Sequence, residues 1–324
     1  MEKKEISKAE ERELIEKTKK LSIKEGSAYS FMDGFCLRYL TPYALAVGAN
    51  NLQIGLLSSI PILFGNLSQL FTFKTMEKES RKKIIFRSIL LQSIMWLVLL
   101  TAGVLYFVYD FRNLIPGYSV IIIYTLLILF GAFSGPAWAS LMRDIVSKNR
   151  GEYFGKRNRI VGGISLACML AGGFILDYFK NTQLFLGFII LFTIAFLGRF
   201  VSALLFLKHY EPKFRTEKKY YFSFLEFIKK SKDNNFGRFV IYVSLIHLAT
   251  AIAGPFFAVY MLKDLGFSYT QFMTVTLSAS LVSLFFMPFW GRFSDRYGNL
   301  EAMKITGLFI PVIPVLWIIS AFIG

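Results

Sequence analysis

Cysteine, histidine and acidic residues are scarce in this chain of 324 residues, which holds two Cys, two His and 21 Asp plus Glu. Cys36 and Cys168 both fall within apolar stretches, so the sequence offers no disulfide framework. Two distant histidines are too few ligands for a zinc centre, and we expect neither a metal nor a cofactor. The sequence shows no nucleophile with a base and no cofactor fingerprint, so its pattern does not favour an enzyme.

Charge is also scarce, because only 18% of the residues are charged whereas 55% are hydrophobic and 35 are Phe. A water-soluble core of ordinary size cannot hide so much apolar surface, so the composition indicates a membrane protein. The net charge of +16 does not indicate nucleic acid, because the 37 Lys and Arg lie in short segments between apolar stretches. We therefore expect the lipid bilayer as a partner and no nucleic acid.

Apolar stretches of about twenty residues recur along the chain, and each is long enough to cross a bilayer core of about 30 Å as a helix. This pattern predicts an all-α, polytopic transmembrane helix bundle. Residues 1–27 are charged and too polar for a signal peptide, so we expect them to be a cytoplasmic tail. The nine expected spans are 28–48, 52–73, 84–109, 117–141, 160–179, 183–207, 239–262, 270–290 and 302–323.

Lys and Arg fall almost entirely on one side of these spans. Of the 37, 32 lie in the N-terminal tail and in alternate loops, and only three lie in the other loops. Because cytoplasmic loops are enriched in Lys and Arg, we expect a cytoplasmic N-terminus in a multi-pass protein of a prokaryotic cell (inner) membrane. Arg38 and Arg199 lie within spans, and we expect Arg199 to extend its long side chain toward the interface.

A dense charge pattern occupies residues 290–298, which read W-G-R-F-S-D-R-Y-G. The spacing of Gly291, Asp295, Arg296 and Gly298 resembles the short inter-helix motif of the major facilitator superfamily, a large group of secondary transporters. In that family the motif follows the second helix and recurs after the eighth, where glycines let helices approach closely and the chain reverse. The resemblance implies a twelve-helix fold of two parallel halves, of which this sequence covers nine helices.

A shift of 218 residues without a gap lays this motif on residues 73–80, which indicates an internal repeat. Phe73 and Ser80 stand there in place of the two glycines, so we expect a less tight first hairpin that keeps the charge pattern. The evidence for the repeat is two pairs of matched charges at matched helix ends, together with one matched glycine pair and one matched glutamine pair. The matched pairs are Lys74 and Arg292, Glu77 and Asp295, Gly48 and Gly266, and Gln53 and Gln271.

The repeat predicts the parallel two-half architecture of such transporters. We expect a six-helix N-terminal bundle at 28–207 and a partial C-terminal bundle of three helices at 239–324. Residues 208–238 are the expected cytoplasmic loop between the halves, in which 221–230 form either a surface helix or part of a solvated tether. The last three helices of the family are absent, which fits either a truncated product or a nine-helix form.

Charged residues within the first span are the leading candidates for a binding site. The resemblance implies that helices 1, 4, 7 and 10 line a central cavity, and a charge inside a membrane usually faces the protein interior. The spacing of Asp33 and Arg38 turns them about 140° apart on a helix, so each needs another partner. Either Arg38 contacts an anionic or polar substrate while Asp33 titrates or pairs near the cytoplasmic mouth, or both form buried ion pairs with other helices.

Aromatic residues on the same helices are further candidates for the cavity wall, although most such residues serve packing. His247 and Asp33 are the candidates for proton coupling, because histidine titrates near neutral pH. The position of His247 near a cytoplasmic helix end favours a hydrated or capping role instead. The aromatic candidates are Tyr39, Tyr43, Tyr124, Trp138, Phe256 and Tyr260.

The loop Arg143–Arg159 resembles the acid and Arg-Gly pattern that the family carries between helices 4 and 5. The resemblance implies a cytoplasmic charge network that locks the outward-facing state, with Glu77 near Arg143. A solvated turn is the alternative. The candidates for this network and for the second hairpin are Glu77, Arg143, Asp144, Arg150, Arg157, Gly291, Asp295, Arg296 and Gly298.

Together these patterns predict a monomeric secondary active transporter that moves a small solute by alternating access, with or without a coupling ion. The alternative is a truncated or non-transporting membrane protein of the same type. Substrate and direction are not indicated, because a family resemblance fixes the scaffold and not the solute.

Overall fold

The computed structural model describes residues 7–109, 117–212, 229 and 234–323, and every regular element in these ranges is a helix. Positions 280, 283–285, 287, 288, 291, 295 and 320–323 are described by their backbone alone. The helices before residue 213 are α1 (Lys8–Phe35), η1 (Leu37–Tyr39), α2 (Leu40–Ala46), α3 (Asn51–Met76), α4 (Arg81–Phe107), α5 (Gly117–Ile145), α6 (Arg150–Phe179) and α7 (Leu184–Phe206). Those after residue 233 are α9 (Asn235–Val259), η2 (Tyr260–Asp264), α10 (Tyr269–Tyr297), α11 (Asn299–Phe309) and α12 (Val312–Ile323).

The predicted all-α transmembrane bundle is confirmed, and its first helix is longer than expected. α1 begins at Lys8, so residues 8–27, which were expected to be a tail, are continuous helix with the first span. This helix is interrupted at Cys36, whose φ of −130° and ψ of −46° lie outside the helical range, and it resumes through the short η1 and α2. The last expected span is likewise split into α11 and α12 around Pro311, which cannot donate a backbone hydrogen bond.

The 218-residue repeat is visible in the backbone of two helix starts. Gly48 and Gly266 both have positive φ, 83° and 66°, and each stands shortly before a helix. α3 and α10 then begin with the same capping box, in which Gln53 or Gln271 exchanges hydrogen bonds with the N-cap residue. The matched glycines and glutamines therefore reflect one local structure that occurs twice.

The helices α1 to α7 form a closely packed group. Their largest buried side chains include Tyr43, Trp96, Phe188 and Phe192, whose rings contact one another between α2, α4 and α7. Small residues allow the close approach, since a Cβ at Gly34 would lie 2.4 Å from the backbone oxygen of Ser165 in α6. Packing of this kind drives helix association in lipid, where apolar burial alone gives little.

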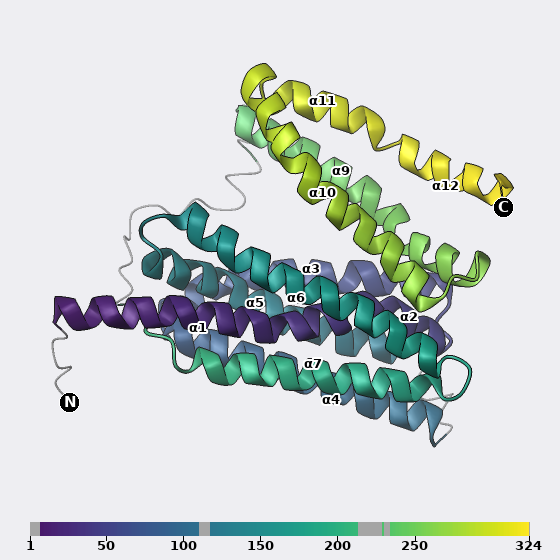
Figure 1. The fold of residues 1–324 in the computed structure, drawn as a ribbon, viewed down its shortest axis with the longest axis horizontal. Helices are drawn as coiled ribbons and strands as arrows, with labels where there is room; N and C mark the ends of the chain where they lie inside the picture. The colour runs from purple at the N-terminus through teal and green to yellow at the C-terminus, as the bar shows by residue number, and fades with distance from the viewer. Residues whose placement is uncertain (1–6, 110–116, 213–228, 230–233, 324) are drawn as a thin grey trace.

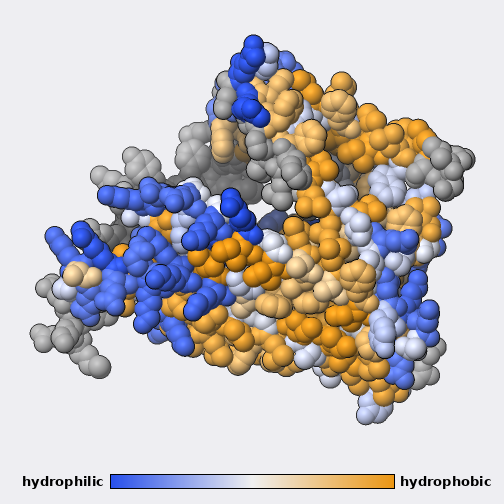
Figure 2. Space-filling view, viewed as in Figure 1, coloured by the Kyte–Doolittle hydropathy of each residue, from blue (hydrophilic) through white to orange (hydrophobic). Residues whose placement is uncertain are grey.

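The helices α9 to α12 form a second group that meets the first at one end only. Figure 1 shows α9 and α10 converging with α2 and the end of α6 on the right and diverging from the first group on the left. The contacts between the groups join α6 to α10, α3 to α9 and α2 to α9. The left end, where α1 begins, carries most of the Lys and Arg, and we call it the basic end. In the space-filling view a hollow separates the two groups on the side of the basic end (Figure 2), and we call it the cleft.

An apolar belt crosses the visible face of the molecule between its two charged ends. Figure 2 shows hydrophobic residues over the middle of the visible face and hydrophilic residues gathered at both sides. Seven helical segments are long and apolar enough to cross a membrane: 51–76, 81–107, 117–145, 150–179, 184–206, 235–264 and 299–319. The other two expected spans correspond to the interrupted first helix and to α10, which is helical throughout 269–297.

Candidate functional site

Arg38 lies in η1, where the first transmembrane helix is interrupted, and its side chain is exposed. The preceding helix, α1, packs against α6 and α7 and touches α5. The Arg38 charge is close enough to interact with Tyr29 of α1 and Tyr124 of α5. No ion pair to Arg38 is found within the described ranges. Arg38 is thus an exposed cation that forms no ion pair with the rest of the described chain.

Asp33 lies one turn before the interruption and faces a different helix. Its carboxylate accepts a hydrogen bond from the hydroxyl of Ser165 in α6. The side chain is partly buried, and among the described residues no ion pair joins it to Arg38. The five-residue spacing thus leaves the two charges separate, each facing its own neighbours.

Tyr39 and Tyr43, expected to line the cavity, are fully buried in the first group instead. The Tyr39 hydroxyl donates to the backbone oxygen of Met169 in α6, and the Tyr43 hydroxyl donates to that of Leu99 in α4 at 3.2 Å. Their hydroxyl groups thus satisfy backbone carbonyls between helices. This placement argues against direct contact with a solute and corrects the expectation for both residues.

The remaining aromatic candidates are divided between the two groups. Tyr124 is partly buried beside the Arg38 charge, and Trp138 lies under the guanidinium of Arg157, 4.9 Å from its ring centroid. Phe256 of α9 lies opposite Gly55 of α3, where the groups meet. Phe256 and Tyr260 also line an apolar pocket of about 420 Å³ between α9 and α12.

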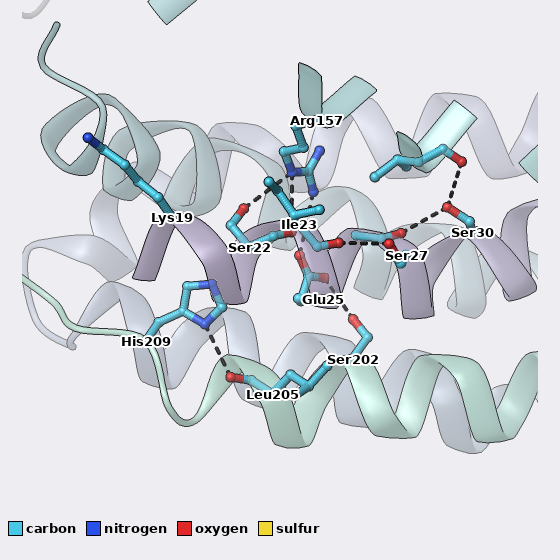
Figure 3. A network of polar contacts seen from close by, with 12 residues as sticks. Lys19, Ser22, Ile23, Glu25, Ser27, Ser30, Arg157, Ser202, Leu205 and His209 are labelled. Carbon is cyan, nitrogen blue, oxygen red and sulfur yellow. Dashed lines mark hydrogen bonds and ion pairs between the residues drawn. The ribbon is translucent and has the colours of Figure 1, made fainter. Parts of the chain in front are cut away.

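A buried charge network ties three helices together near the basic end of the first group (Figure 3). Glu25 of α1 is only 4% exposed, and its Oε1 accepts a hydrogen bond of 2.7 Å from Ser202 of α7. Its Oε2 makes no hydrogen bond among the described residues and lies 3.5 Å from Nη2 of Arg157 in α6. Oε1 also lies 3.9 Å from Nη1 of Arg199 in α7. One carboxylate therefore stands between two arginines.

Arg199 does not extend to the interface as expected. It is 6% exposed, and its Nε donates a 2.6 Å hydrogen bond to the side-chain oxygen of Gln92 in α4. Its guanidinium also lies over the ring of Tyr29, 5.0 Å from the centroid. The expectation was wrong because partners on α1 and α4, which the sequence alone does not pair with α7, satisfy this cation inside the bundle.

A second charge cluster lies where α4 begins. Arg81 is fully buried, and its Nη1 forms a 2.6 Å ion pair with Asp144 of α5. Glu211, which follows α7, accepts hydrogen bonds from the Arg81 backbone N–H at 2.8 Å and from the Ser80 hydroxyl at 2.6 Å. The Arg81 Nη2 also donates to the backbone oxygen of Pro212. The cluster fixes the start of the 208–238 loop to the first group.

The predicted network around Arg143 has a different composition in the described contacts. The acid beside Arg143 is Asp144, 4.0 Å from its Nε, and the Arg143 side chain is 65% exposed. Arg150 donates to the backbone oxygens of Val146 and Arg143 and so fixes the turn between α5 and α6. The pairing of Glu77 with Arg143 stays a prediction. Arg157 does belong to a network, but its acid is Glu25.

The second hairpin is tighter than the first, as its glycines predicted. Gly298, with a φ of 87°, ends α10 and directly precedes α11, whereas residues 77–80 separate α3 from α4. Gly291 lies within α10, and Arg296 covers the ring of Tyr297 at 5.3 Å. The side chain of Asp295 and the expected helix at 221–230 lie outside the described residues, apart from position 229.

The two histidines occupy opposite environments. His247 in α9 is exposed, in keeping with a hydrated role. His209, which follows α7, is buried against Phe206, its Nδ1 lies 3.2 Å from the Leu205 backbone oxygen, and its Nε2 makes no hydrogen bond among the described residues. Burial lowers the pKa of His209 below its ordinary value because it disfavours the charged imidazolium.

Sequence reasoning missed several polar residues that the structure brings together. Glu25 was assigned to the tail, and Arg81 and Glu211 were counted as loop charges. A signal for Glu25 existed, because it stands only two residues before Ser27, close to the start of the first expected span. No comparable signal marks Gln92 or Asp177, which resemble ordinary polar residues in a span and at a helix end. Their partners lie on helices distant in sequence.

The interrupted first helix, the membrane belt and the cleft between two helical groups define a polytopic membrane protein of the transport type. The model of the Major Facilitator Superfamily matches residues 26–324, and the chain belongs to this family. No curated protein and no solved structure matches the chain.

Proposed function

We propose that the protein is a secondary active transporter that moves a small solute bearing an anionic group by alternating access in a cell membrane. The observation that carries the proposal is Arg38, which stands exposed at the interrupted first helix without an ion pair among the described residues. A cation at this depth costs several kcal/mol unless it is hydrated or neutralised. A cleft that admits water and then an anionic solute meets this requirement.

Residues of α1, α5 and α9 supply the rest of the proposed site. Tyr124 from α5 offers a hydroxyl and a ring, and Phe256 from α9 approaches the first group at Gly55 of α3. Asp33 lies five residues before Arg38 and shares a hydrogen bond with the neutral Ser165, and we propose it as the proton-coupling group.

The orientation that we propose places the basic end in the cytoplasm, because Lys and Arg are enriched in cytoplasmic loops. The cleft then opens inward in this conformation, and the contacts between α6 and α10 lie at the extracytoplasmic end. Alternating access requires these contacts to open when the basic ends of the two groups close.

The test is transport in proteoliposomes, after a thermal-shift panel of small carboxylates, phosphates, amino acids and neutral sugars has selected a ligand. Arg38→Ala is expected to abolish both the thermal shift and the uptake, whereas Arg38→Lys retains part of each because the charge remains. Arg87→Ala is the matched control, since this exposed arginine pairs with Glu79 on the surface.

Unchanged transport by Arg38→Ala would remove this residue from the site. Selection of neutral ligands alone would contradict the anionic solute class. A folded protein that transports no member of the panel would favour the alternative, a membrane protein of this family without transport activity.

A further inference from the structure

The two groups of helices are joined by a carboxylate at the end opposite the basic loops. Asp177, near the end of α6, accepts the backbone N–H of Tyr269 on Oδ1 at 2.7 Å and that of Thr270 on Oδ2 at 2.9 Å. These two residues are the first two of α10. One side chain of the first group therefore binds the N-terminus of a helix in the second.

Favourable electrostatics reinforce this contact. The first N–H groups of a helix have no partner within the helix, and the helix dipole places partial positive charge there. A carboxylate that bridges two such groups makes two charge-assisted hydrogen bonds. Ser268 and Gln271 complete the first turn through their capping box, so Asp177 binds the N–H groups that the box leaves over.

The helix does not need Asp177 in order to begin. α3 starts with the same capping box, formed by Asn50 and Gln53, while its first two residues, Asn51 and Leu52, lie exposed. The same type of capping box therefore initiates α3, for which the described contacts show no carboxylate from a neighbouring helix. The two hydrogen bonds of Asp177 therefore serve to join α6 of the first group to α10 of the second.

A close backbone approach marks the same place. Gly173, one turn before Asp177, is buried, and a Cβ there would lie 3.0 Å from Cα and 3.2 Å from N of Thr270. Glycine thus lets α6 lie directly against the start of α10. Any larger side chain must push the two helices apart, because the atoms that it meets are backbone.

We propose that Asp177 is the latch that holds the cleft closed at this end, and that its two hydrogen bonds must break each time the protein opens there. The inference rests on the proposed alternating access. Opening transfers a carboxylate and two N–H groups to water, which hydrates all three. The latch therefore biases the equilibrium between closed and open forms while still permitting exchange.

The experiment measures the opening directly, by the distance between spin labels in lipid nanodiscs without any solute. The labels are carried by Lys180→Cys and Lys263→Cys, two exposed positions at the ends of α6 and η2. The native Cys36 and Cys168 are buried, and an unsubstituted sample measures their background. In this labelled background Asp177→Ala is expected to raise the ratio of the long to the short distance about tenfold, which corresponds to about 1.4 kcal/mol.

Three further variants complete the experiment. Asp177→Asn is expected to give a smaller increase, because its amide keeps one acceptor oxygen but loses the charge. Asp264→Ala is the matched control, since this aspartate lies at the same end but is exposed, and the distances are expected to stay unchanged. Gly173→Ala reaches the same contact without altering the carboxylate, and it is expected to raise the long-distance population too.

An unchanged distance distribution in both folded Asp177→Ala and Gly173→Ala would overturn the latch. If only Asp177→Ala fails to fold, Gly173→Ala and Asp177→Asn decide the question. Because the measurement uses no solute, absent transport with a clear distance shift would contradict the proposed function alone. Intact transport with no shift would contradict the latch alone.

Discussion

The two groups of helices share a sequence repeat but differ in how much of each is buried. Within the apolar 18-residue stretch of each span, 28% to 44% of residues are buried in the first group, whereas the share is 0% for the corresponding stretches of 235–264 and 299–319 in the second. Turn glycines and capping boxes are nevertheless alike in α3 and α10. Local signals therefore set where each helix starts, while burial depends on the helices packed around it.

The two groups also differ in how deeply their charged residues are buried. The first group holds Glu25 and Arg81 inside the protein: Glu25 is bound to residues of α6 and α7, and Arg81 is bound to α5 and to the segment that follows α7. In the second group the ion pair between Glu301 and Lys304 lies on one helix, one turn apart, and both side chains are about half exposed. Buried pairs fix several helices against one another, whereas a pair on one helix surface supports only that helix.

The largest expected effect tests this contrast in charge. Glu25→Ala leaves Arg157 and Arg199 without their shared carboxylate. It is expected to lower the free energy of unfolding by about 3 to 5 kcal/mol, as when one partner of a buried ion pair is removed. Glu301→Ala removes an exposed pair within one helix and is expected to cost under about 0.5 kcal/mol. A thiol-reactive dye reports unfolding in detergent, because both native cysteines are buried. Equal losses of stability in the two variants would contradict the contrast between buried and exposed ion pairs.

A smaller effect tests the feature that the two groups share. Gly48→Ala and Gly266→Ala each place a Cβ on a residue of positive φ, which costs about 1 to 2 kcal/mol. The Cβ at position 48 would also meet the Tyr106 hydroxyl at 3.4 Å, whereas nothing lies within 4 Å at position 266. Melting in the same dye assay is therefore expected to fall in both variants, by slightly more for Gly48→Ala. Full stability in either would show that its turn is not needed.

The smallest effect concerns the two histidines and pH. Because burial lowers the pKa of His209, the unfolded chain binds a proton below pH of about 6.5 while the folded protein resists it. Stability contributed by neutral His209 is thus complete above that pH and is lost as the pH falls through it. We expect the melting temperature to decline from pH 7 to 5.5 and His209→Gln to reduce the slope.

The exposed His247 of the second group provides the control for this measurement. The variant His247→Gln keeps His209 in place, so the slope is expected to remain as in the unsubstituted protein. A slope that disappears with His247→Gln and survives His209→Gln would reverse the assignment of the titrating group.

Much of the fold follows from the sequence, because lipid permits few backbone arrangements. Apolar length predicts the spans, the alternation of Lys and Arg predicts which ends lie together, and Gly298 predicts the tight second hairpin. Pro311 gives the reason for the split of the last span, but the split itself was not expected. The boundary placed at residue 27 was misleading, because a charged stretch that packs on its neighbours continues the helix.

Less of the candidate site follows, because a helix that is apolar on all sides does not reveal which face is buried. Tyr39 and Tyr43 were expected in the cavity for this reason, yet both face α4, α6 and α7. Arg199 and Glu25 lie 174 positions apart, and only the packing of α1 on α7 brings them together. Arg38, by contrast, was identified by the cost of its charge alone, which does not depend on the fold.

The unbroken run of α1 has a practical consequence. Its 28 residues make a rod about 42 Å long, and Tyr153 and Tyr210 bind its charged half to the first group. A fluorophore attached near Ser7 would lie at the end of a continuous helix that has no interruption before Cys36. The rotational motion of the fluorophore would therefore report how the whole first group tilts relative to the bilayer, rather than the independent motion of a flexible tail.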